Sequence, residues 1–252
     1  MIEYGLSETK YWINCIIKET YSQHGEDKII DNLLGHKNGF YIDVGANDPT
    51  RFNNTKRFYE LGWRGINIEP DLNKFKELKN HRKRDINLNI GIGEKNSKLT
   101  FYKFVPDTLS TFSNTEAEKY QKQGYKTSDK VKVQVKKLRD VLKKYCKNKA
   151  IDFISIDTEG YEMQVLKSND WKKIRPIVVY VESIKHDKDR LIKTKEVELN
   201  LYLKEKGYSC VFDSGLNSLY LLTSYKKQQN IESETTVGMT DIINRIYKLL
   251  GL

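Results

Sequence analysis

Short apolar runs alternate with amphipathic segments along most of the chain. Runs rich in Ile, Val and Phe have the length of buried strands, and they lie at residues 40–44, 65–69, 86–90, 152–156 and 177–181. Apolar positions between these runs predict helices at residues 54–61, 72–80, 138–147 and 161–167. Alternation of this kind is typical of crossover units, so the pattern predicts an α/β fold with a mainly parallel sheet.

The last part of the pattern is different. Segment 196–206 predicts a helix, although its apolar positions are less regular than those of the earlier helices. Strands are predicted at 208–212 and 218–223, and the segment between them is too short for a helical crossover. We therefore expect a mostly parallel seven-stranded sheet with helices on both faces and a final antiparallel strand.

Three segments are predicted to lie outside this regular pattern. Residues 1–38 predict an N-terminal helical segment, and residues 39–225 form the main domain. Within the main domain, residues 98–136 begin and end with strand-like runs but are polar between them, which is typical of a lid, a substrate loop or a disordered insertion. Residues 226–252 predict a linker followed by an amphipathic helix.

The apolar side chains of that last helix fall on one face, and they belong to Ile242, Ile243, Ile246, Leu249 and Leu250. Such a face is typical of docking onto the main domain or onto a second subunit in a homo-oligomer. Binding to a membrane surface is the weaker alternative, because few basic residues flank the apolar face.

Composition narrows the class of protein. Hydrophobic residues make up 38% and charged residues 31% of the chain, which suits a soluble globular domain. We find no apolar run near the roughly 20 residues of a membrane helix, and no secretory signal pattern. The cysteines, Cys15, Cys146 and Cys210, are too far apart in sequence for a zinc knuckle and provide no disulfide framework. We therefore expect a cytoplasmic protein, in which the glycosylation sequon at residues 53–55 is a chance match.

The chain carries a net charge of +10, from 44 basic and 34 acidic residues. Two interpretations remain open. Lysines can simply solvate the surface, or the positive charge can favour an anionic partner such as a phosphorylated or nucleotide-linked metabolite.

The first predicted strand ends in the sequence DVGANDPT, residues 43–50. Ligands of open α/β sheets bind beyond the carboxyl ends of the strands. Gly45 would allow close approach of the backbone, and Asn47 tolerates unusual dihedral angles. A dinucleotide fingerprint would need glycines where Asn47 and Thr50 stand, and no GxxxxGK[ST] loop is present. The turn therefore predicts a cofactor that lacks a pyrophosphate.

The second predicted strand ends in Glu69, followed by Pro70. An acid at this place is suited to accept hydrogen bonds from two ribose hydroxyls. Asp43, at the end of the first strand, suits a ligand that carries positive charge. An adenosine with an amino group and a sulfonium, S-adenosylmethionine, combines these properties. The alternative is that both acids merely end buried strands.

Several segments together resemble FkbM-type S-adenosylmethionine-dependent methyltransferases. They are SQHGED (22–27), GFYIDVGANDPTRFNNT (39–55), FYELGWRGINIEP (58–70), LSTFSNTEAEKY (109–120), and IDFISIDTEGYEMQVLKSNDW with RPIVVYVE (151–182). The resemblance implies a Rossmann-like class I methyltransferase fold and O-methylation, often of sugars. With this resemblance, the candidate cofactor-binding residues are Gln23, Asp43, Gly45, Ala46, Asn47, Glu69 and Pro70.

A sugar hydroxyl needs a base, or a metal that lowers its pKa, before it can attack a methyl group. Asp157 and Glu159 follow the fourth predicted strand, and Glu182 and His186 follow the fifth. Because the ends of neighbouring parallel strands meet, we expect these side chains to converge. The candidate catalytic residues are Asp157, Glu159 and His186. Asp157 and Glu182 are the candidate ligands of Mg²⁺, Mn²⁺ or Fe²⁺.

Alternatives remain at this site. Without a metal, Asp157 or His186 would be the base directly, and Glu159 could instead favour the start of the following helix. His24 could approach the ligand or simply be exposed. Ser110, Thr111 and Ser113 could line the substrate pocket from the insertion.

We therefore predict an S-adenosylmethionine-dependent O-methyltransferase acting on a sugar hydroxyl, in a nucleotide-linked sugar or a surface polysaccharide precursor. The alternatives are an RNA methyltransferase and a non-catalytic cofactor-binding module. Residues 157–160 lack the Pro-Pro-aromatic platform of adenine methyltransferases, and no cysteine follows a proline as cytosine methylation would require. We therefore expect no nucleic-acid partner.

Overall fold

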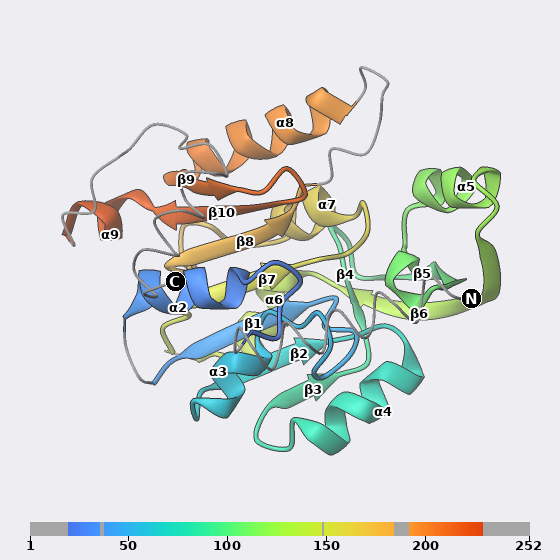
Figure 1. Ribbon diagram of the computed structural model, residues 1–252, viewed down its shortest axis with the longest axis horizontal. Helices are drawn as coiled ribbons and strands as arrows, with labels where there is room; N and C mark the ends of the chain where they lie inside the picture. Colours follow the sequence, from blue (N-terminus) through green and yellow to red (C-terminus); the bar gives the residue numbers. More distant parts are fainter. Residues whose placement is uncertain (1–19, 36–37, 148, 184–191, 229–252) are drawn as a thin grey trace.

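The computed structural model describes residues 20–35, 38–147, 149–183 and 192–228 (Figure 1). One large sheet of seven strands dominates, in the order β3-β2-β1-β7-β8-β10-β9. Its strands are β1 (Phe40–Val44), β2 (Arg64–Ile68), β3 (Ile86–Leu88), β7 (Phe153–Ile156), β8 (Val178–Glu182), β9 (Tyr208–Asp213) and β10 (Asn217–Leu222). Neighbouring strands from β3 to β8 pair in parallel, and β10 is antiparallel to both β8 and β9. The predicted fold class is confirmed.

Helices cover both faces of this sheet. They are α2 (Glu26–Leu34), α3 (Lys56–Glu60), α4 (Leu72–His81), α6 (Leu138–Tyr145), α7 (Glu162–Lys167), α8 (Ile192–Glu205) and α9 (Thr223–Gln228). The side chains of β1 alternate between two cores. Ile42 packs with residues of α6, α7 and α8, whereas Tyr41 packs on the opposite face with residues of α2 and α3. Both faces of β1 are buried, which explains why its sequence reads as an almost continuous apolar run.

Residues 91–136 add a second, three-stranded sheet in the order β4-β6-β5. Its strands are β4 (Gly91–Ile92), β5 (Ser97–Val105) and β6 (Lys126–Lys136), with β5 and β6 antiparallel. The 3-10 helix η1 (Asp107–Leu109) and helix α5 (Asn114–Lys122) lie between β5 and β6 in the chain. The segment predicted as an insertion thus forms a hairpin that carries a helix at its tip, to one side of the large sheet (Figure 1).

Several predicted helix boundaries shift. Helix α3 begins at Lys56 rather than at residue 54, because Asn54 and Thr55 are buried polar residues of the preceding turn. Helix α8 begins at Ile192, before the predicted start at residue 196. Its apolar residues alternate, so Leu199 and Leu203 face the core while Val197 and Leu201 are exposed. This division explains the irregular spacing noted in the sequence.

The sequon residues Asn53, Asn54 and Thr55 are all buried, so a glycan cannot be attached without unfolding this turn. None of the described helices is long and apolar enough to cross a bilayer. The apolar face predicted for residues 242–250 and the whole segment before residue 20 lie outside the described residues, so the predicted segment boundaries stay predictions.

Helix α8 offers a matched pair of substitutions that tests its orientation. Leu203 is fully buried, and Leu203→Ala should lower the free energy of unfolding by about 2–5 kcal/mol, since it removes packing and leaves a cavity. Leu201 is 56% exposed, and Leu201→Ala should change it by less than about 0.5 kcal/mol. Urea denaturation of both variants measures the difference, and equal losses would contradict this orientation of α8.

Candidate active site

The order of strands reverses next to β1, and this brings the ends of β1, β2, β7 and β8 together. Val44 lies opposite Ile68 of β2 and Ile156 of β7, and Ile156 lies opposite Val181 of β8. The residues that follow these positions therefore emerge side by side at the carboxyl edge of the sheet. They are Gly45, Glu69, Asp157 and Glu182.

A pocket lies beyond this edge. Its lining comes from the turn after β1, the end of β2 and the start of α4, the loop after β7, and the segment that forms the second sheet and η1. The residues are Asp43 to Asp48, Arg51 to Asn54, Ile68 to Asp71, Lys74, Ile90 to Ile92, Phe101, Asp107, Thr108, Ser110, Phe112, Ser155, and Asp157 to Glu159. Among the candidate cofactor residues, Asp43, Gly45, Ala46, Asn47, Glu69 and Pro70 all line it.

Gly45 has a φ of +82°, in the left-handed region. A Cβ atom at this position would lie 1.7 Å from the backbone oxygen of Asp157. The close approach that Gly45 permits is therefore a contact between the turn after β1 and the loop after β7. Asn47 also has a positive φ, of 44°, which agrees with the expectation of an unusual dihedral angle.

Glu69 fixes the shape of the turn after β1. Its Oε2 accepts a hydrogen bond of 2.7 Å from the backbone N–H of Asn47, and its Oε1 accepts one of 2.7 Å from that of Asp71. Burial raises the pKa of Glu69 to about 8 in spite of these two donors. Each carboxylate oxygen keeps the capacity to accept one more hydrogen bond, since a carboxylate accepts about four.

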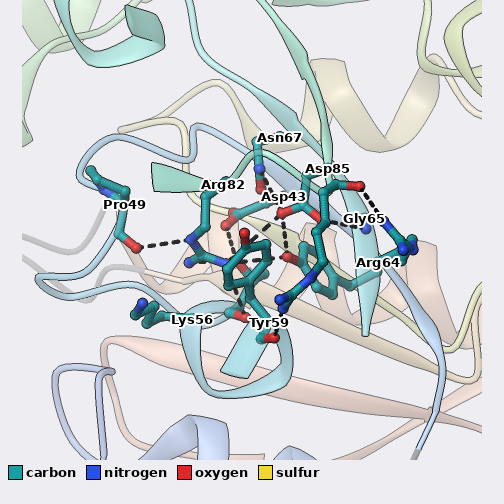
Figure 2. A network of polar contacts seen from close by, with 12 residues as sticks. Asp43, Pro49, Lys56, Tyr59, Arg64, Gly65, Asn67, Arg82 and Asp85 are labelled. Atoms are coloured by element: carbon teal, nitrogen blue, oxygen red, sulfur yellow. Dashed lines mark hydrogen bonds and ion pairs between the residues drawn. The ribbon is translucent and has the colours of Figure 1, made fainter. Parts of the chain in front are cut away.

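Asp43 is 3% exposed, and side chains of the segment between β1 and α3 donate hydrogen bonds to it. Its Oδ2 accepts hydrogen bonds from Thr55 Oγ1 at 2.8 Å and from Asn53 Nδ2 at 3.5 Å. Burial raises its pKa to about 6. Asp43 thus joins the pocket to a polar network in the protein interior, shown in Figure 2.

Asp157, Glu159 and Glu182 form an acidic cluster, in which one oxygen of each residue lies within 4.8 Å of the others. Burial raises the pKa of Asp157 to about 7. Burial and then the charge of Asp157 raise the pKa values of Glu159 and Glu182 well above their ordinary range. Glu182 Oε2 is buried without a hydrogen-bond partner among the described residues. The cluster therefore needs a proton or a cation to compensate its charge.

Glu162 organises the loop that carries this cluster. Its Oε1 accepts hydrogen bonds from the N–H and Oγ1 of Thr158 and from the N–H of Gly160, at 2.9–3.0 Å. Helix α7 begins at Glu162, so this residue occupies the helix start that we considered for Glu159. The side chain of Glu159 is free of that role and lines the pocket.

The insertion binds Glu159 at two atoms. Thr111 Oγ1 donates to the backbone oxygen of Glu159 at 2.8 Å, and Tyr120 Oη of α5 donates to its Oε2 at 2.8 Å. Glu159 has a φ of 53°, which is uncommon for a residue with a side chain. These contacts, made from outside the large sheet, hold the carboxylate in the acidic cluster.

Of the remaining candidate residues that the structure describes, only Ser110 lines the pocket. Gln23 and His24 are exposed and do not line the pocket. Ser110 does line it, whereas Ser113 caps α5 by accepting a hydrogen bond from Glu116 N–H. His186 lies outside the described residues.

Four residues that shape the site were not predicted from the sequence. Arg82 and Thr55 support the turn after β1, and Glu162 and Tyr120 fix the loop after β7. Glu162 had a local signal, because an acid in the first turn of a helix can bond to the preceding backbone. The other three depend on contacts between residues far apart in sequence.

The acidic cluster predicts a stability change with pH. The folded-state pKa of Glu182 lies well above the ordinary 4.5, because burial favours the protonated carboxyl group. Its contribution to the free energy of unfolding is therefore fully present below pH 4.5 and is lost as the pH rises through the folded-state pKa. Glu182→Gln removes this loss, and should raise stability at pH 8 by about 1 kcal/mol or more while leaving it nearly unchanged at pH 4.5.

Thermal melting at the two pH values, in buffer with chelator, measures this effect. Glu205→Gln is the matched control, because Glu205 is exposed near the end of α8 and should show no change at either pH. A Glu182→Gln variant with equal shifts at both pH values would contradict the assigned charge repulsion.

Solved structures with a similar chain fold include methyltransferases, at low sequence identity. The chain is similar to a candidate caffeoyl-CoA O-methyltransferase from Staphylococcus aureus, with 11% identity, a TM-score of 0.42, and coverage of 82% of this chain and 88% of the other. It is similar to an O-methyltransferase from Bacillus cereus in complex with S-adenosylhomocysteine, with 12% identity, a TM-score of 0.38, and coverage of 85% and 89%. It is also similar to a chain of the fibrillarin/Nop5p complex, with 13% identity, a TM-score of 0.40, and coverage of 76% of this chain and 77% of the other. The search among curated proteins found no match.

The family comparison is the more informative one. The model of the methyltransferase FkbM domain matches residues 43–210, which is more than half of the chain and includes the turn after β1, the acidic cluster and the insertion. The predicted resemblance is confirmed, and the chain belongs to the FkbM methyltransferase family.

Proposed function

We propose that this methyltransferase transfers a methyl group from S-adenosylmethionine to a carbohydrate hydroxyl, in a nucleotide-linked sugar or a polysaccharide precursor. The observation that carries this proposal is that Glu69, Asp157 and Glu159 line one pocket, with Glu182 beside the last two. A ribose-binding acid and a set of potential bases thus lie at neighbouring strand ends.

The described residues fit the cofactor. Glu69 keeps acceptor capacity for two ribose hydroxyls, and Asn47 Oδ1 is a buried acceptor without a partner among the described residues. Ile68, Ile90 and Phe101 provide an apolar wall suited to adenine. The cofactor supplies a methyl group activated by a sulfonium, and the negative charge of Asp43 and Asp157 suits a cationic ligand.

The acidic cluster fits activation of a hydroxyl. A base with a pKa near the working pH is the most effective, and the value of about 7 for Asp157 meets this condition. A divalent cation would also fit, because three carboxylate oxygens within 4.8 Å form a set of hard ligands. We propose Asp157 and Glu182, with Glu159, as the ligands of Mg²⁺, Mn²⁺ or Fe²⁺. His186 stays a predicted second base.

The preference for a carbohydrate acceptor comes from the family and from the net charge of +10. Arg51 and Lys74 bring positive charge to the pocket, where both pair with Asp107 of η1, at 3.6 and 2.9 Å. A phosphorylated acceptor would find these cations at the edge of the pocket.

A methyl-transfer assay with nucleotide sugars, with and without chelator, tests the acceptor and the metal together. We expect turnover with at least one nucleotide sugar, and loss of at least about 10-fold of it on chelation, since the metal would activate the hydroxyl. Addition of Mg²⁺ or Mn²⁺ should restore the rate. Turnover that is unaffected by chelator would refute the metal part, and methylation of RNA instead of any sugar would refute the acceptor.

Two substitutions separate chemistry from cofactor binding. Asp157→Asn should lower kcat by about 100-fold or more, because the amide cannot accept a proton, while the affinity for S-adenosylhomocysteine remains within a few-fold. Glu69→Ala should weaken that affinity by about 10- to 100-fold, because it removes two hydrogen-bond acceptors, each worth about 0.5–1.5 kcal/mol net.

Calorimetry and initial rates measure both effects. Asp129→Asn and Glu60→Ala are the matched controls, since both side chains are exposed and distant from the pocket lining. An Asp157→Asn enzyme with the wild-type kcat would remove Asp157 from the reaction.

A further inference from the structure

Arg82, directly after α4, has a fully buried guanidinium group. All five of its N–H donors have acceptors. Nε donates to Pro49 O at 3.0 Å, Nη1 to Tyr41 Oη at 3.2 Å and Thr55 O at 3.4 Å, and Nη2 to Asn53 Oδ1 at 2.6 Å and Thr55 Oγ1 at 3.4 Å. The guanidinium also lies over the ring of Tyr59, 5.0 Å from its centroid (Figure 2).

Four of these five bonds end on the segment that follows β1. Pro49, Asn53 and Thr55 belong to the chain between β1 and α3, and Asn53 itself lines the pocket. The fifth bond ends on the hydroxyl of Tyr41, which lies in β1. This hydroxyl donates in turn to Asp85, which is not part of the turn. Arg82 thus connects the end of α4 to a segment about 30 residues earlier in the chain.

The partners of Arg82 contact the pocket residues in turn. Asn53 Nδ2 donates to the backbone oxygens of Ala46 and Asp48, at 3.1 and 3.0 Å. Thr55 Oγ1 donates to Asp43 Oδ2 at 2.8 Å. The side chains of Asn53 and Thr55 therefore connect Arg82 to residues that line the pocket.

The charge of Arg82 also matters. Its Nη1 lies 4.0 Å from Asp85 Oδ2, with both side chains fully buried, and its positive charge opposes the effect of burial on the pKa of Asp43. Asp85 accepts hydrogen bonds from the N–H of Gly65 at 2.9 Å and from Asn67 Nδ2 at 3.0 Å. Removal of the cation would leave the buried carboxylates of Asp43 and Asp85 with hydrogen-bond donors but without this positive charge, which is costly in a low dielectric.

We propose that Arg82 is a positioning residue for cofactor binding, which holds the turn after β1 in its ligand-binding shape through Asn53 and Thr55. Arg82 itself does not line the pocket, and it acts on the pocket through these partners. The proposal rests on the cofactor part of the proposed function and is independent of the acceptor and of the metal.

The test uses S-adenosylhomocysteine as the probe, in calorimetry with the full chain. Arg82→Lys keeps a positive charge but loses the fork that reaches Pro49, Asn53 and Thr55 together. We expect it to bind S-adenosylhomocysteine at least 10-fold more weakly. Arg84→Lys is the matched control, because Arg84 is exposed and donates to Tyr59 O instead of to the turn, and its affinity should be unchanged.

Two more variants distinguish positioning from a general loss of stability. Asn53→Ala removes the bonds to Ala46 and Asp48 and should also weaken binding by 10-fold or more, even if Arg82→Lys fails to fold. Tyr41→Phe removes a bond on the side away from the turn, and should lower the melting temperature while the affinity stays within about two-fold.

The outcomes are separable. Wild-type affinity in folded Arg82→Lys or in Asn53→Ala would overturn the proposal, as would a Tyr41→Phe variant that loses as much affinity as Arg82→Lys at a similar melting temperature. Failure of the wild-type chain to bind S-adenosylhomocysteine would instead refute the proposed function.

Discussion

The contact between Gly45 and the backbone of Asp157 determines the geometry of this molecule's site. The turn after β1 and the loop after β7 approach so closely that only a hydrogen atom fits on the Gly45 Cα in that direction. This contact is available because β1 pairs directly with β7, on the side opposite β2. Glu69 and Asp157 consequently reach one pocket from the two sides of β1, although 88 residues separate them in the sequence.

The same arrangement concentrates carboxylates where water is scarce. Asp43, Glu69, Asp157, Glu159 and Glu182 all have raised pKa values, and burial is the largest cause for each. The protein compensates these groups in different ways. Glu69 receives backbone N–H groups, Asp43 receives a hydroxyl and lies near Arg82, and the cluster around Glu182 keeps an oxygen without a partner among the described residues. Incomplete compensation is typical of sites that bind a cation or move a proton.

Sequence patterns were sufficient for the sheet and for the strand ends. Because parallel strands follow each other through crossovers, the ordinal place of Glu69 and Asp157 already predicted that they would meet at one edge. The supporting residues were not accessible in this way. Arg82 stands in the polar run NHRKRD, where nothing local distinguishes a buried guanidinium from the exposed Lys83 and Arg84 beside it. Its burial depends on acceptors from a distant turn, and Tyr120 likewise acquires its role only when the hairpin of the insertion folds back towards the loop after β7.

That hairpin has a consequence for how enzymes of this kind could diversify. Thr111 and Tyr120 hold Glu159 by its backbone oxygen and its carboxylate, so the insertion also supports an acid of the proposed catalytic cluster. Grafting a foreign hairpin to recruit a new acceptor would therefore disturb reactivity together with selectivity. Only grafts that retain a hydroxyl at each of these two places would let one property change without the other.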